Sequence, residues 1–141
     1  MTKAAILARL RAYPALLPGL VGILGAAALT YVSLSDPDQP GHYPTCPWLA
    51  LTGTYCPGCG TLRMLHAFTH GHLATGFGLN PLGALVLVWA AVEYGRWTWS
   101  SLTGRRFVPR PRNPYAVWGV IVVILAYWVV RNLPFGAVLA P

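Results

Sequence analysis

The sequence predicts an all-α integral membrane protein with three transmembrane helices and a segment of short helices between the first and the second. Only 9% of the 141 residues are charged, whereas 55% are hydrophobic. Soluble domains carry about 25% charged residues, so this composition provides too little polar surface to face water. Three long apolar runs supply the spans, and the length suits a single membrane domain over residues 1–141.

The first predicted span covers residues 15–34, a run without any charged residue. About twenty apolar residues are needed to cross the hydrocarbon core of a bilayer as a helix. Lys3, Arg9 and Arg11 precede this run, as they would in a signal peptide. The apolar core of a signal peptide is only about 7–15 residues long, so we expect an uncleaved helix.

The second and third predicted spans, residues 81–100 and 114–130, each begin at an Asn-Pro pair. Asparagine is a favoured N-cap, and proline is favoured in the first turn of a helix. Glu93 is the one acidic residue expected at membrane depth, which makes it a functional candidate. Because Arg96 follows three residues later, we expect instead an interfacial i,i+3 ion pair.

Basic residues set the predicted orientation of the chain. The N-terminal segment and the four-arginine loop at residues 103–113 are expected in the cytoplasm by the positive-inside rule. Residues 35–80 contain two aspartates and one arginine, and are expected outside together with the C-terminus. The protein should then cross the plasma membrane several times, with its cysteines on the side where disulfides persist.

The net charge of +7 is explained by this topology and by contact with anionic lipid headgroups. The lipid bilayer is therefore the expected partner. The basic residues form no recognition helix and no patch interleaved with aromatic residues, so nucleic acid is not an expected partner.

Short helices are expected within residues 35–80. Glycines at positions 53 and 71 are typical of helix C-termini. Such helices would lie on the membrane or dip into it, and their backbone is satisfied only if they pack against the spans. The expected helical ranges are residues 47–52 and 62–70, and a further apolar stretch over residues 73–79 leads to Asn80.

The expected helix around residues 59–70 carries a polar stripe. Cys59, Arg63, His66 and His70 follow one another at steps of four, three and four residues. Because Cys59 lies near the helix N-terminus with Arg63 one turn away, we expect a lowered Cys59 pKa and a thiolate stabilised by Arg63. The alternative is a solvated face of an interfacial helix.

These residues carry a resemblance to a known family. The pattern consists of Cys46-Pro47, Thr52-Gly53, Cys56 to Gly60, Arg63, His70-Gly71 and Asn80-Pro81. It resembles the domain-of-unknown-function family 2752, small bacterial membrane proteins with a CPGCG motif, over about residues 46–82. The resemblance implies a small helical membrane protein and brings no established activity or catalytic residue. His42 and His66 are not part of the pattern.

The cysteines permit a metal site. A closed structural zinc site takes four Cys or His ligands, and Cys46, Cys56 and Cys59 would supply three. His42 is the candidate fourth ligand, because it lies four residues before Cys46. His66 is unsuitable, since seven residues along a helix place it about 10 Å from Cys59.

Two other chemistries remain open from the sequence. A structural disulfide would join Cys46 to Cys56 or Cys59 and leave one thiol over. Alternatively, Cys56 and Cys59 form the reactive pair of a thiol–disulfide oxidoreductase, with Cys46 as a resolving thiol and Arg63 stabilising a thiolate.

A structural role is favoured over an enzymatic one. The leading prediction is an accessory or scaffold membrane protein whose Cys46/Cys56/Cys59 centre is held by a disulfide or a metal, zinc being the expected metal. The alternative is the membrane oxidoreductase. A second alternative is a subunit of a transporter or larger complex, with other membrane proteins as partners.

Overall fold

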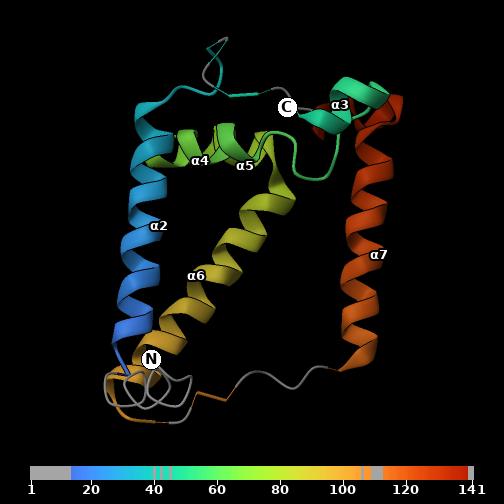
Figure 1. Cartoon of the computed structure of the whole chain (residues 1–141). Helices are drawn as coiled ribbons and strands as arrows, with labels where there is room; N and C mark the ends of the chain where they lie inside the picture. The colour runs from blue at the N-terminus through green and yellow to red at the C-terminus, as the bar shows by residue number, and fades with distance from the viewer. Residues whose placement is uncertain are drawn as a thin grey trace.

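The computed structural model describes residues 14–39, 41, 43–44, 46–105, 107–108 and 113–139. Within these residues the chain forms α-helices and one 3-10 helix and contains no strand, which confirms the all-α prediction. Figure 1 shows the short helices gathered at one end of the long helices, which we call the cysteine end. The elements are α2 Leu16–Leu34, α3 Pro47–Thr52, α4 Thr61–Thr69, α5 Leu73–Leu79, α6 Pro81–Leu102, α7 Pro114–Arg131 and η1 Pro134–Leu139.

Among the described residues, two helices are long and apolar enough to cross a membrane, α2 and α7. The third long helix, α6, qualifies only together with α5, from which it is bent by 115°. Glu93 and Arg96 lie within α6, and their side chains pair at 2.9 Å as the spacing predicts. The helices therefore provide two candidate spans, or three if the bent pair counts as one span.

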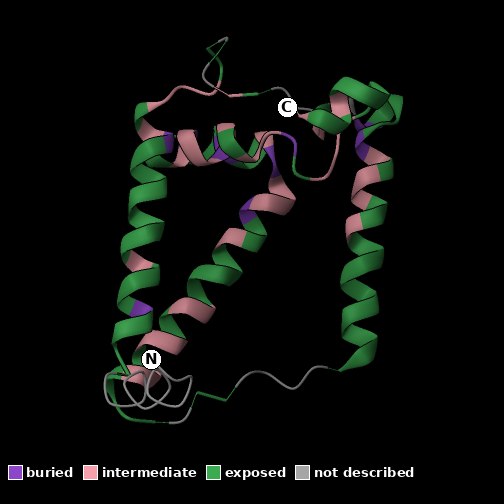
Figure 2. Cartoon of the chain, in the orientation of Figure 1, coloured by how far each residue is buried: buried purple, intermediate pink, exposed green. Residues whose placement is uncertain are grey.

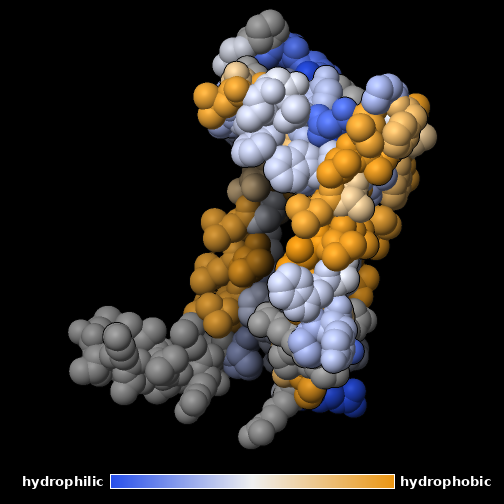
Figure 3. All heavy atoms as spheres, turned by 90° about the vertical axis from the view of Figure 1, so that its right-hand side faces the viewer, coloured by the Kyte–Doolittle hydropathy of each residue, from blue (hydrophilic) through white to orange (hydrophobic). Residues whose placement is uncertain are grey.

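The long helices expose their apolar side chains. Figure 2 shows α2 and α7 as exposed along most of their length, and Figure 3 shows hydrophobic residues covering the long helices. Leu24 in α2 is 69% exposed and Val122 in α7 is 61% exposed. Side chains of this kind are stable in hydrocarbon and unfavourable in water, as expected for a membrane protein.

The predicted helix boundaries agree closely with the structure because the caps determine them locally. The side chain of Asn80 accepts a hydrogen bond from Gly83 N–H at the start of α6. Asn113 does the same for Tyr115 N–H at the start of α7. At the end of α3, Gly53 adopts a φ of 70°, a left-handed conformation that a residue with a Cβ rarely adopts.

The packed core lies at the cysteine end (Figure 2). Helices α4 and α5 run between the ends of α2 and α6 (Figure 1) and pack on each other. The rings of Phe68 and Phe77 have their centroids 5.5 Å apart, and Met64 is 1% exposed. Gly76 is buried where the Phe68 ring fills the space that a side chain would need.

Hydrogen bonds join the long helices to this core. His66 in α4 contacts the carbonyl of Val32 in α2 at 2.8 Å. Asn132, just after α7, exchanges two hydrogen bonds of 2.8 Å with the backbone of Tyr55. These bonds connect segments that are distant in the sequence, so they fix where α2 and α7 meet the short helices.

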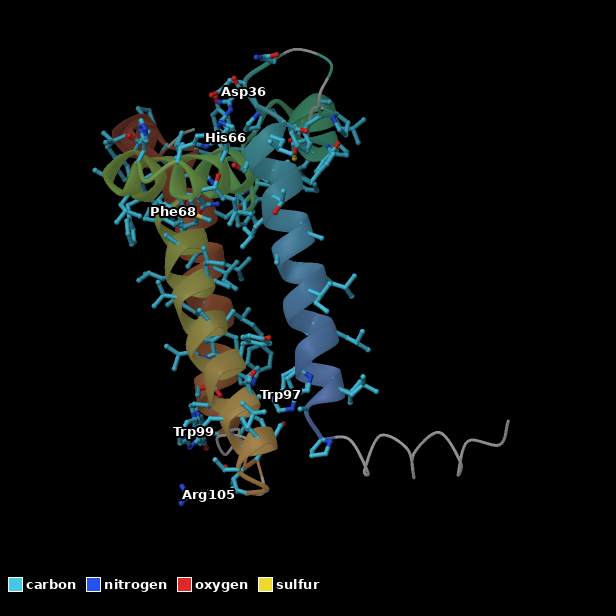
Figure 4. All side chains as sticks on the ribbon, turned by 90° about the vertical axis from the view of Figure 1, so that its left-hand side faces the viewer. Asp36, His66, Phe68, Trp97, Trp99 and Arg105 are labelled. Atoms are coloured by element: carbon cyan, nitrogen blue, oxygen red, sulfur yellow. The ribbon has the colours of Figure 1, made fainter. Side chains whose placement is uncertain are left out.

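The opposite end carries the aromatic residues expected at a membrane interface. Figure 4 shows Trp97 and Trp99 near the end of α6, with Arg105 beyond them. Aromatic and basic residues favour this depth because their rings and charges meet the lipid headgroups. Most of the residues that carry the predicted orientation lie outside the described residues: Lys3, Arg9, Arg11, Arg106, Arg110 and Arg112. The orientation therefore stays a prediction.

Candidate metal centre

A tight turn brings the second and third cysteines together. Cys59 N–H donates a hydrogen bond of 3.1 Å to the carbonyl of Cys56, and Pro57 and Gly58 form the corner. Gly60 then adopts a φ of 84°, which directs the chain into α4 at Thr61. As a result the Sγ atoms of Cys56 and Cys59 lie 3.2 Å apart.

The first cysteine reaches this turn from the start of α3. Cys46 is the N-cap residue of that helix, and its Sγ lies 3.6 Å from Cys56 Sγ. All three sulfur atoms lie within 4.8 Å of one another, and all three cysteines are free thiols. Tetrahedral zinc–sulfur bonds of about 2.3 Å place thiolates about 3.8 Å apart, so small shifts of the side chains would accommodate an ion.

The three thiols differ in their electrostatic environment. Burial raises the pKa of Cys59 to about 12, and the neighbouring Cys56 thiol adds to the effect. The Leu49 N–H, in the first turn of α3, lowers the pKa of Cys46. The expectation of a lowered Cys59 pKa is therefore wrong. Cys59 is only 8% exposed, and desolvation raises its pKa by more than the nearby helix terminus lowers it.

The contact that the structure gives Arg63 is an ion pair with Asp38 and not a contact with a thiol. Its Nε pairs with an oxygen of Asp38 at 2.6 Å, and both side chains remain well exposed. The two residues lie at a pocket of about 800 Å³ whose lining includes the three cysteines and Tyr43. The Tyr43 hydroxyl is buried and has no hydrogen-bond partner within the described part of the chain. His42, the candidate fourth ligand, lies outside the described residues.

The arginine that supports the cysteine turn is Arg131, the last residue of α7. It is 1% exposed, and its guanidinium donates to the carbonyls of Cys56 and Cys59, each at 3.1 Å, and of Leu139 at 3.0 Å. Its carbon atom also lies 5.2 Å from the centre of the Tyr127 ring. In the sequence, an arginine that ends an apolar span indicates only a boundary, so this role was missed.

Asn80 supports the same turn from the other side. It is fully buried, and its Nδ2 lies 3.1 Å from the Pro57 carbonyl, 3.2 Å from that of Cys59 and 3.0 Å from Thr61 Oγ1. Its Oδ1 accepts from Gly83 N–H and from the Tyr127 hydroxyl. The N-cap role was predictable from the Asn-Pro pair, whereas the contacts with the cysteine turn depend on the tertiary fold.

A positive charge is thus buried against the backbone of the turn that carries Cys56 and Cys59. Among the described residues, the salt bridges join Arg63 to Asp38 and Arg96 to Glu93, and neither includes Arg131. A buried ion without a counter-charge costs several kcal/mol. The carbonyl groups offset part of this cost, and a negatively charged thiolate centre above the turn would offset more.

The fold and the site together define a helical protein with apolar, membrane-type helices and a three-thiol cluster at one end. A family model described as "Protein of unknown function (DUF2752)" matches residues 46–94, about a third of the chain. This match confirms the family resemblance over that segment, which includes all three cysteines and Asn80 but not Arg131. No curated protein and no solved structure matches the chain.

Proposed function

We propose that this chain is an accessory or scaffold membrane protein whose three cysteines hold a structural zinc ion. The observation that carries the proposal is the convergence of Cys46, Cys56 and Cys59, with their sulfur atoms within 4.8 Å of one another. Thiolates are the ligands that structural zinc sites use most, and a Cys-x-x-Cys pair is the usual half of such a site. Zinc would tie the start of α3 to the turn before α4.

The charge of the site supports a divalent ion. Three thiolates and one Zn²⁺ carry a net charge of −1, which the buried guanidinium of Arg131 balances. The pocket beside the thiols leaves room for a fourth ligand. We assign this position to His42, whose place four residues before Cys46 suits a four-ligand site.

The membrane arrangement belongs to the same proposal. Three spans, formed by α2, the bent α5–α6 pair and α7, would put the cysteine end outside the cell and the 103–113 loop in the cytoplasm. The apolar surface of α7 would face the lipid of the plasma membrane or the helices of other membrane proteins. A membrane-impermeant thiol reagent should then label the reduced protein in intact cells, and a complete lack of labelling would refute this orientation.

Metal analysis and a free-thiol count on the detergent-purified protein test the zinc site. We expect one zinc ion per chain at the thiols, and we expect Cys46→Ser and Cys56→Ser to lose it. His42→Ala should weaken binding, whereas His72→Ala, a change at the exposed N-cap residue that precedes α5, should leave it unaltered. A protein that shows a stable disulfide and binds no zinc after reduction contradicts the proposal.

A thiol–disulfide oxidoreductase is the second candidate, and the central position of Cys56 favours it. Its sulfur lies 3.2 Å from Cys59 and 3.6 Å from Cys46, so it could form a disulfide with either. In such a step two thiols form one S–S bond and release two protons and two electrons, which a quinone or another disulfide takes up. An apolar cavity of about 400 Å³, lined by Gly58, Met64 and residues of α6, lies beneath the turn and could admit a hydrophobic acceptor.

Redox titration separates the two candidates. An oxidoreductase requires that Cys56 and Cys59 cycle at a potential above about −200 mV, because inert structural disulfides lie much lower. Zinc bound to all three thiolates with no reversible disulfide would exclude the redox function. A reversible pair that exchanges electrons with a quinone would exclude a purely structural role.

A further inference from the structure

Two histidines form a second cluster of metal-ligating side chains, away from the thiols. His66 and His70 lie one turn apart at the C-terminal end of α4, with their ring centroids 4.3 Å apart. The spacing i,i+4 places two imidazoles on one face of a helix, which is how helical two-histidine metal sites are built. Figure 4 shows His66 at the cysteine end, below Asp36.

The hydrogen bonds of the two rings determine which nitrogen carries the proton. His66 Nδ1 lies 2.8 Å from the Val32 carbonyl, and His70 Nδ1 lies 2.9 Å from the His66 carbonyl. A carbonyl oxygen only accepts hydrogen bonds, so Nδ1 is the donor in both rings. In the neutral imidazole, Nε2 then keeps a free lone pair.

This is the state in which a histidine binds a metal ion. Ligating histidines usually donate their other N–H to a carbonyl or carboxylate, which fixes the orientation and tautomer of the ring. Here both rings are already oriented by carbonyl groups, and one of these belongs to a different helix, α2. His70 is exposed and His66 is half-buried, so an ion would have access from outside.

The pair is separate from the thiol cluster. The converging group of possible metal ligands comprises Cys46, Cys56 and Cys59, and among the described residues no histidine nitrogen belongs to it. Arg63 lies in α4 between the cysteine turn and His66 in the chain, and it pairs with Asp38. One ion cannot contact both groups, since zinc ligand atoms lie within about 4 Å of one another.

We propose that His66 and His70 form a surface site for a divalent transition-metal ion, bound through their two Nε2 atoms. Imidazole suits Zn²⁺, Cu²⁺ and Ni²⁺, and water completes the coordination at an exposed site of this kind. This site does not depend on zinc binding by the cysteines, because neither histidine belongs to the group formed by Cys46, Cys56 and Cys59.

Ni²⁺ titration of the purified, reduced full-length protein tests this site. The variants are His66→Gln and His70→Gln, whose amide N–H groups can still donate to the same carbonyls while the metal-binding nitrogen is lost. The matched control is His72→Gln, at an exposed histidine two residues further along the chain. Cys56→Ser serves as the control for binding at the thiols, and absorption by sulfur-to-nickel charge transfer distinguishes the two sites.

Besides any binding at the thiols, which sulfur-to-nickel absorption reveals, we expect a separate component of Ni²⁺ binding that shows no such absorption. We expect His66→Gln and His70→Gln each to weaken this component by at least about tenfold. His72→Gln and Cys56→Ser should leave this binding unchanged. The proposal fails if His72→Gln weakens binding as much as the other two, if either variant of the pair binds like the wild type, or if Cys56→Ser abolishes all Ni²⁺ binding. Unaltered thermal unfolding of His70→Gln confirms that any loss is not due to misfolding.

Discussion

Replacement of Arg131 by methionine should destabilise the cysteine end of the fold strongly. Methionine is unbranched and fills a similar volume, but it donates no hydrogen bond and carries no charge. The substitution therefore removes the guanidinium from the carbonyls of Cys56, Cys59 and Leu139 while it leaves those carbonyls in a buried position. Arg131 itself is 1% exposed, so water cannot replace the lost donors without rearrangement of the turn.

The expected magnitude follows from these contacts. A hydrogen bond to a charged group contributes about 1.5–3 kcal/mol, and five such bonds of the Arg131 guanidinium are lost, although the contributions of bonds within one network do not add fully. Removal of one partner from a buried charged interaction typically costs about 3–5 kcal/mol. We therefore expect Arg131→Met to lower the free energy of unfolding by about 3–5 kcal/mol, and Arg131→Lys by less, because the charge remains but the forked geometry is lost.

Arg63→Met is the matched control. Arg63 forms a salt bridge with Asp38, but the two side chains are 42% and 67% exposed, so solvent screens the pair. Exposed pairs contribute about 0–1 kcal/mol, and Arg63→Met should change stability by no more than that. Unfolding in detergent, followed by circular dichroism, gives the stability, and competition with a chelator gives the zinc affinity. The argument is refuted if Arg131→Met unfolds and binds zinc like Arg63→Met.

Three further predictions concern the thiols and the supports of the turn. The pKa of Cys46 is lowered, and burial raises the pKa of Cys59 to about 12. Alkylation of the reduced, metal-free protein should therefore modify Cys46 before Cys59 as the pH rises. Mass spectrometry of pulsed samples gives the order, and modification of Cys59 before Cys46 contradicts it. Asn80→Ala should lower the free energy of unfolding by about 2–3 kcal/mol, because loss of this fully buried amide leaves several partners unsatisfied. Asn113→Ala, at an exposed N-cap, should lower it by about 1 kcal/mol. Equal shifts in the melting temperatures of the two variants would show that the buried contacts of Asn80 contribute nothing. Gly76→Ala should lower the melting temperature because the added methyl group meets the Phe68 ring, while Gly78→Ala in the same helix meets nothing within 4 Å and should be neutral or slightly stabilising.

The helices were predictable because their signals are local. A charge-free apolar run is sufficient to predict α2, and the Asn-Pro pairs mark where α6 and α7 begin. Glycines mark where α3 and α4 end, because only a residue without a Cβ readily adopts a positive φ there. The pairing of Glu93 with Arg96 was also predictable, since one helix places residues three apart on the same face.

Contacts between distant segments could not be predicted in this way. Arg131 lies more than seventy residues from the cysteine turn, and its guanidinium reaches that turn only because α7 ends beside it. From the sequence alone, the thiolate-stabilising role falls to Arg63, which is close to Cys59 in the chain, and a lowered Cys59 pKa is expected. The fold instead buries Cys59, and desolvation then outweighs the local helix terminus.

The sequence by itself determined the membrane character of this protein, the helix boundaries and the concentration of its thiols in one segment, because composition and short-range caps decide these properties. Only the tertiary structure decided that the three sulfur atoms converge, that Arg131 and Asn80 support their turn, and that His66 is oriented by a carbonyl of α2. The physical reason is that burial and hydrogen bonding between distant segments depend on how the helices pack, and no local pattern encodes that packing.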